Sequence, residues 1–169
     1  MIESINNLVK TLNQAKSELD YMKAFDSMSI PLRDFQKYYT WNQTHYTRNC
    51  ISKTKEYELD LICFSINQTL PIVSIPSTKV FIVNIEGSLL TEKFKKDLTN
   101  GLVAIKTAET GENNSIIALK PEDLFTQKNS SNLTAASLHL YLNPLHYLTE
   151  HLKDGSTHRK LVHYDSNYS

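Results

Sequence analysis

The spacing of apolar residues in this chain changes near residue 40. Before that point, apolar side chains recur every three or four positions, which predicts an amphipathic helix over residues 4–24. The stripe consists of Ile5, Leu8, Val9, Leu12, Ala15, Leu19 and Met22. Ser29 followed by Pro31 is typical of a helix N-cap and first turn, and predicts a short second helix that ends near Tyr39.

From Tyr46 onward the apolar residues alternate with polar ones, which is the period of a β-strand. Glycine, proline and asparagine residues separate the alternating runs at short and regular intervals. The predicted strands are Tyr46–Ile51, Tyr57–Ser65, Lys79–Ile85, Ser88–Phe94, Leu102–Thr107, Ser115–Leu119, Leu124–Lys128, Ala135–Tyr141 and Leu161–Tyr164. So many short strands after two helices favour a mainly β protein in which the sheet closes or rolls into a barrel.

The chain is organised as a single domain, because its 169 residues contain no Gly- or Ser-rich linker. We expect residues 1–40 to form a helical part that packs on the barrel. Residues 41–147 form the barrel itself, and residues 148–169 form a tail that packs on it or extends from it.

Composition and charge exclude several classes of function. Lys and Arg together number 18, as do Asp and Glu, so the formal net charge is zero and no basic surface for nucleic acid is indicated. No apolar run is long enough to cross a membrane, and the start lacks the pattern of a secretory signal, so we expect a cytoplasmic protein without membrane insertion. Cys50 and Cys63 lie in apolar strands and are expected to be reduced core thiols.

Two groups of polar residues fall inside predicted strands. Ser137, His139 and Tyr141 alternate along one strand and therefore share a face, where we expect a hydrogen-bonded row that points into the barrel. Arg48 lies in the first strand, and a buried guanidinium needs an anionic partner. Glu58 or Asp60 from the adjacent strand could supply it, as could the carboxylate of a bound ligand.

Four stretches resemble the cysteine dioxygenase family, the thiol dioxygenases among the cupins. They are Tyr46-Thr47-Arg48-Asn49-Cys50, residues 57–64 (YELDLICF), residues 85–89 (IEGSL), and Ser137-Leu138-His139-Leu140-Tyr141 followed by Pro144. Their order and approximate spacing agree with the family from about Trp41 to Tyr147. The resemblance implies a cupin-type (jelly-roll) β-barrel with two N-terminal α-helices packed on it.

The resemblance also implies roles for particular residues. In the family, three histidines hold a ferrous ion that activates cysteine and dioxygen. Arg48 matches an arginine that binds the substrate carboxylate, where a planar fork of donors is favourable. Tyr46 matches the residue that neighbours this arginine in the family. Ser137, His139 and Tyr141 match a hydrogen-bonded relay beside the substrate.

The iron ligands themselves have no counterparts in this chain. Val73 and Ile75 occupy the positions of a His-x-His pair, and Phe125 falls near the third histidine. Val80 stands where animal members of the family have a cysteine that is crosslinked to the tyrosine. Because valine, isoleucine and phenylalanine offer no lone pair to a metal, we predict a divergent member of the family that binds no Fe(II) and has no other cofactor.

The expected function is therefore that of a non-catalytic pseudoenzyme whose barrel serves as an interaction or assembly module for a protein partner. One alternative is a sensor that binds a small carboxylate or amino acid through Arg48, Tyr46 and Tyr141. A second alternative is a cysteine or thiol dioxygenase whose metal ligands have moved elsewhere in the chain. The three functions differ in what fills the barrel interior: packed apolar side chains in the interaction module, a bound ligand in the sensor, or a metal ion in the dioxygenase.

Overall fold

The computed structural model describes residues 1–75, 79–97, 101–110 and 115–169, with the backbone alone for residues 106–110. Within these residues, two α-helices and two 3₁₀ turns precede twelve strands. The helical elements are α1 (Ile5–Leu12), α2 (Glu18–Asp26), η1 (Leu32–Asp34) and η2 (Gln36–Tyr38). The strands are β1 (Thr47–Lys53), β2 (Tyr57–Phe64), β3 (Val73–Ser74), β4 (Lys79–Glu86), β5 (Leu89–Asp97), β6 (Gly101–Thr110), β7 (Ile117–Leu119), β8 (Leu124–Asn129), β9 (Ala135–Leu142), β10 (Tyr147–His151), β11 (Thr157–Leu161) and β12 (Ser166–Asn167).

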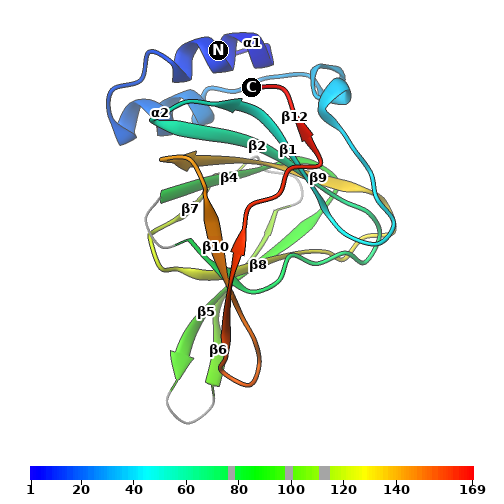
Figure 1. Ribbon diagram of the computed structural model, residues 1–169. Coiled ribbons are helices and arrows are strands. Elements are labelled where there is room, and N and C mark those ends of the chain that lie inside the picture. The colour runs from blue at the N-terminus through cyan, green and yellow to red at the C-terminus, as the bar shows by residue number, and fades with distance from the viewer. Residues whose placement is uncertain (76–78, 98–100, 111–114) are drawn as a thin grey trace.

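The strands form two six-stranded sheets that face each other. The first has the order β12-β1-β2-β9-β4-β7, and the second has the order β11-β10-β3-β8-β5-β6. The two helices lie across the outer face of the first sheet, while the β5–β6 hairpin projects away from the opposite end of the molecule (Figure 1). The mainly β barrel and the helical layer expected from the sequence are therefore both present.

Alternation along the central strands divides the core into two clusters, one on each face of the first sheet. Leu59, Leu61, Leu138 and Leu140 face the helices and pack with residues such as Leu8. The neighbouring positions on β2, β4 and β9 face the barrel interior, and those with apolar side chains pack there. These interior residues are Ile62, Phe64, Val80, Ile82 and Tyr141, which pack with Val73, Phe125 and others from the second sheet.

The N-terminal helical region differs from the prediction. The single helix expected over residues 4–24 is interrupted, and α2 begins after Ser17. The Ser17 hydroxyl accepts a hydrogen bond from the backbone N–H of Asp20, and the Asp20 carboxylate accepts one from the backbone N–H of Ser17. This reciprocal capping starts a second helix with a new phase, so that Leu19 and Met22 are exposed. The second helix expected between Ser29 and Tyr39 is replaced by the two short 3₁₀ turns.

The tail at residues 148–169 also contains more structure than expected. β10 pairs with β3 and β11, and β12 lies parallel to β1 at the edge of the first sheet. The strand predicted at Leu161–Tyr164 lies almost entirely outside β11, which ends at Leu161. The tail therefore adds strands to both sheets.

Candidate functional site

A buried polar row crosses the barrel interior, and it begins at Arg48 on β1. The Nη1 atom of Arg48 donates to Asp60 Oδ2 at 2.6 Å and to the hydroxyl of Tyr141 at 2.9 Å. Asp60 comes from β2 and Tyr141 from β9, and all three side chains are buried. Of the two carboxylates considered as partners, Asp60 is therefore the one that neutralises Arg48. Glu58 pairs instead with Lys53, at 2.9 Å.

The row continues from Tyr141 through His139 and Ser137, as the alternation on β9 predicts. His139 Nδ1 lies 3.0 Å from the Tyr141 hydroxyl, and His139 Nε2 lies 2.8 Å from Ser137 Oγ. Gln127 of β8 closes the row, because its Oε1 accepts from Ser137 Oγ at 3.1 Å and lies 2.9 Å from His139 Nε2.

These partners fix the direction of the hydrogen bonds. Gln127 Oε1 can only accept, so the proton of a neutral His139 is placed on Nε2. Nδ1 then accepts from the Tyr141 hydroxyl, and that hydroxyl in turn accepts from Arg48. From Arg48 to Gln127 the row is a chain of paired donors and acceptors, which is how buried polar groups are stabilised, while the second carboxylate oxygen of Asp60, Oδ1, is buried without a hydrogen-bond partner.

Burial determines the protonation states along the row. Burial, with a smaller contribution from the nearby positive charge of Arg48, lowers the pKa of His139 well below its usual value, so the imidazole is neutral. Burial raises the pKa of Asp60 to about 7, although Arg48 acts in the opposite direction. Burial would lower the pKa of Arg48, but Tyr141 and Asp60 outweigh it and keep the guanidinium charged.

The positions that the sequence assigned to lost iron ligands lie together on the other side of the interior. Val73 and Phe125 are direct cross-strand partners between β3 and β8. Both are buried, as is Ile75, and all three belong to the interior apolar cluster. The three side chains fill this space by packing, and none of them can bind a metal or donate a proton.

Among the described residues, one group of potential metal ligands lies close together, away from those positions. The ligand atoms of Cys50, Glu58 and Asp60 all lie within 4.8 Å of one another and are buried. Arg48 and Lys53 already neutralise the two carboxylates, and the Tyr164 hydroxyl donates to Glu58 at 2.7 Å. Burial raises the pKa of the Cys50 thiol to about 12. The two adjacent cations and the protonated thiol do not fit a divalent metal.

The two cysteines are free and buried, as expected of core thiols. The four histidines from residue 146 onward divide into two groups. His151 is buried on β10, where its Nε2 lies 2.8 Å from Ser74 Oγ, whereas His146, His158 and His163 are exposed.

The C-terminal segment covers the edge of the barrel beside Arg48. Asp165 Oδ2 accepts from the backbone N–H of Arg48 at 2.9 Å, and Asp165 Oδ1 lies 3.1 Å from His45 Nε2. A pocket of about 240 Å³ opens between this segment and β1. Its lining includes Tyr46, Arg48, Lys160 and His163. Tyr141, which was expected beside the same ligand, bonds to Arg48 from the barrel interior and does not line this pocket.

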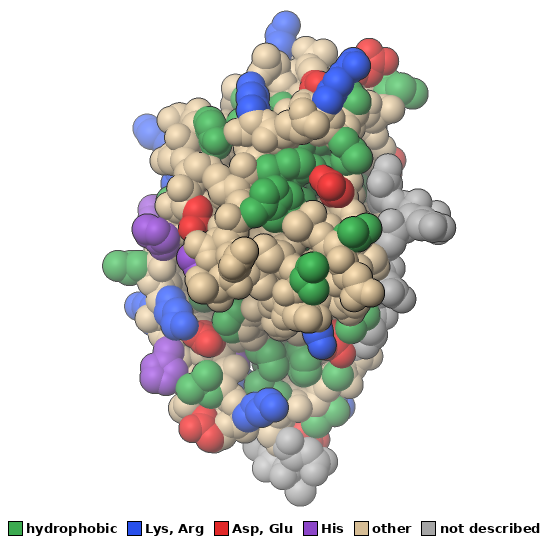
Figure 2. All heavy atoms as spheres, turned by 90° about the vertical axis from the view of Figure 1, so that its right-hand side faces the viewer, with side chains coloured by type: hydrophobic (Ala, Val, Ile, Leu, Met, Phe, Trp, Pro, Cys, Tyr) green, Lys and Arg blue, Asp and Glu red, His purple; other side chains and the backbone are tan. Residues whose placement is uncertain are grey.

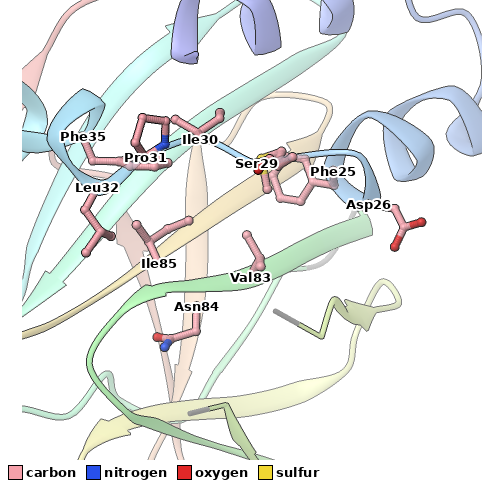
Figure 3. Close-up of a pocket in the computed structure, with 11 residues that line it drawn as sticks. Phe25, Asp26, Ser29, Ile30, Pro31, Leu32, Phe35, Val83, Asn84 and Ile85 are labelled. Carbon is pink, nitrogen blue, oxygen red and sulfur yellow. The ribbon is translucent and has the colours of Figure 1, made fainter. Parts of the chain in front are cut away.

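A larger groove of about 480 Å³ lies on the helical side of the first sheet. Val83 and Ile85 of β4 point toward the segment that carries Ile30 and Pro31, while Asn84 between them points the opposite way (Figure 3). Apolar residues such as Phe25 and Phe35 line this groove together with Asp26 and Ser29, and it lies on the opposite face of the first sheet from the polar row. It brings no reactive groups together.

Sequence reasoning missed three residues of the site. Gln127 shares a strand face with Phe125, two positions away, so the period of β8 could have placed it in the interior. Lys53, which neutralises Glu58, comes from a strand end, and Tyr164, which donates a hydrogen bond to Glu58, comes from the tail. No local pattern marks either residue.

Comparison with known proteins supports the fold. No protein-family model and no curated protein matches the chain. Among solved structures, TT1209 from Thermus thermophilus aligns with a TM-score of 0.55 at 12% identity, over 69% of this chain and 98% of its own. BH2720 from Bacillus halodurans aligns with a TM-score of 0.53 at 14% identity, over 78% of this chain and 88% of its own. A conserved protein with a double-stranded β-helix domain from Klebsiella pneumoniae aligns with a TM-score of 0.51 at 12% identity, over 76% of this chain and 93% of its own.

At such low identity these similarities establish the fold alone: a double-stranded β-helix, the cupin-type β-barrel, on which this structure shows N-terminal helices. They provide no evidence for the thiol dioxygenase branch in particular. Within the described residues, no helix has the length and hydrophobicity that a membrane span requires.

Proposed function

We propose that this protein is a non-catalytic cupin, related to the cysteine dioxygenases, whose barrel acts as an interaction and assembly module. One observation carries the proposal: Val73, Ile75 and Phe125 are packed together as core at the positions where the family would hold iron. Aliphatic and aromatic side chains cannot coordinate a transition metal. The module therefore needs no cofactor, and its partner is a protein.

The polar row supports the same proposal. A relay that serves catalysis needs a reactive group at one end, such as a metal-bound substrate. Here the row runs from the Arg48–Asp60 pair to Gln127, whose Nε2 donates to Thr91 Oγ1 at 3.1 Å, so both ends are bonded to protein groups. The row thus serves to hold β1, β2, β8 and β9 together across the barrel.

The test is a dioxygenase assay on protein incubated with ferrous iron under reducing conditions. We expect no conversion of cysteine to cysteine sulfinic acid above the rate of the same iron solution without protein. Turnover that depends on the protein would contradict the proposal and would favour a dioxygenase with displaced ligands.

A second candidate function is the binding of a small carboxylate or amino acid, and the 240 Å³ pocket beside Arg48 is the observation that favours it. Arg48, Lys160 and His163 line this pocket, and a guanidinium offers a planar pair of donors to a carboxylate. Tyr46 lies at the same pocket, in agreement with its proposed role beside the clamp.

Thermal unfolding in the presence of amino acids and thiol acids tests this candidate. A ligand should raise the melting temperature of the wild-type protein and leave that of an Arg48→Met/Asp60→Leu variant unchanged. The double substitution removes the guanidinium without leaving an unpaired buried carboxylate. Equal shifts in both proteins would show that Arg48 is not the binding group.

A further inference from the structure

Three loops at one end of the barrel contain no charged residue. They are residues 40–45 (TWNQTH), 65–70 (SINQTL) and 129–134 (NSSNLT), although Asp, Glu, Lys and Arg make up 21% of the chain. We call these three segments the loop face. Figure 2 looks onto this end of the molecule, where hydrophobic and uncharged side chains occupy the middle. The charged side chains lie mainly toward the border.

Each of the three loops exposes one large apolar side chain. Trp41, the only tryptophan, is 41% exposed, Ile66 is 51% exposed and Leu133 is 72% exposed. Trp41 also stacks at a tilt on Tyr39, with ring centroids 5.2 Å apart.

Hydrogen bonds fix the loops relative to one another. The carbonyl of Asn42 accepts from Ser65 Oγ at 2.8 Å and from Gln68 Nε2 at 2.7 Å. The buried Asn129 donates through Nδ2 to the carbonyls of Ser65 and Leu133, at 3.1 and 2.7 Å. Trp41 and Ile66 directly adjoin bonded residues in the sequence, and Leu133 is itself bonded through its carbonyl. These bonds hold the three apolar side chains in place, so the loop face is preorganised for binding.

From these observations we infer that the loop face is the surface through which two copies of this chain associate. The inference rests on the proposed assembly function and names its partner. Protein interfaces have cores that are depleted of charge and enriched in aromatic residues, with tryptophan prominent among the residues that dominate affinity. The loop face has both properties.

The chemistry of the loop face favours a second copy of the same chain. In a two-fold symmetric dimer the same patch meets itself, so charges of one sign would face like charges. A patch without charges avoids this repulsion. Amides and hydroxyls both donate and accept hydrogen bonds, so each can pair with its counterpart. Leu70 and Asn129 are buried, so sixteen of the eighteen residues in the three segments are available, which approaches the roughly 20 residues that one side of a standard interface contributes.

Sedimentation velocity over a range of protein concentrations tests the inference, with two matched substitutions. Ile66→Lys places a like charge in both halves of the interface, whereas Ile105→Lys changes an isoleucine of similar exposure, 56%, on the β5–β6 hairpin. We expect a dimer of the 19.4 kDa chain for the wild type and for Ile105→Lys. For Ile66→Lys we expect the dissociation constant to rise about 100-fold. Leu133→Lys should act like Ile66→Lys and provides a second variant at a more exposed position.

The fluorescence of the single tryptophan gives an independent readout. Emission should move to shorter wavelength as the wild-type protein is concentrated, and should stay constant in Ile66→Lys. A wild-type protein that remains monomeric throughout, or a dimer that persists in both loop-face variants, would overturn the inference. So would a monomer whose tryptophan emission responds to neutral oligosaccharides, because the loop face would then be a glycan site. None of these results bears on metal content or turnover, so the proposed loss of catalysis is judged separately.

Discussion

The two halves of the barrel interior are stabilised in different ways. On one side, Val73, Ile75 and Phe125 fill space, and their contribution depends on volume and shape. On the other side, Arg48, Asp60 and the row from Tyr141 to Gln127 are stabilised by pairing, and their contribution depends on each group retaining its partner. The difference indicates that one barrel interior can combine a polar scaffold with an ordinary apolar core.

The largest expected effect is on the apolar side. Phe125→Ala removes a buried ring next to Val73 and leaves a cavity, so the free energy of unfolding should fall by about 3–5 kcal/mol in chemical denaturation. Phe125→Leu keeps most of the volume and should cost less than about 1.5 kcal/mol. If the alanine variant were as stable as the wild type, Phe125 would border an open site.

On the polar side, Arg48→Met should lower the free energy of unfolding by about 3 kcal/mol, because it leaves Asp60 buried without its partner. Adding Asp60→Leu should restore most of this loss, since two apolar side chains need no pairing. The double-mutant cycle is measured by denaturation at one pH. Losses that simply add would mean that the two side chains do not interact.

A smaller effect should appear in the pH dependence of stability. The pKa of His139 is lowered in the folded protein, so below pH about 6.5 the unfolded chain binds a proton that the folded chain does not. This contribution to stability is therefore complete above that pH and is lost as the pH falls below it. His139→Gln lacks the contribution, so its stability should decline less steeply than that of the wild type between pH 6.5 and 5. Parallel curves would indicate a solvated imidazole. The raised pKa of Asp60 acts in both proteins and cancels in the comparison.

Much of the barrel was predictable because its strands show a clear period. On β9 the alternation alone assigned Ser137, His139 and Tyr141 to one face. The predicted strands Lys79–Ile85 and Ser88–Phe94 left Glu86-Gly87 between them as a turn. Gly87 adopts a φ of +70°, and a Cβ there would lie 2.6 Å from the Thr134 carbonyl oxygen, so only glycine suits this corner.

Other elements were not predictable because they depend on distant partners. β3 and β12 have two residues each, which is too short to show a period, and they exist through pairing with strands far away in the sequence. The break between α1 and α2 did have a local signal, Ser17 followed three positions later by Asp20, but the continuing apolar stripe concealed it. The choice between Glu58 and Asp60 as the partner of Arg48 could not be predicted either, because it depends on the positions of three strands.

Metal content is the most direct test of the central claim that the iron-binding half of the barrel has become core. The protein would be purified without chelators or affinity metals from cells grown with ample iron, and its transition metals measured against protein concentration. We predict iron and all other transition metals at background, far below one ion per chain. Iron or another transition metal near one ion per chain would contradict the assignment of Val73, Ile75 and Phe125 and restore the case for an enzyme.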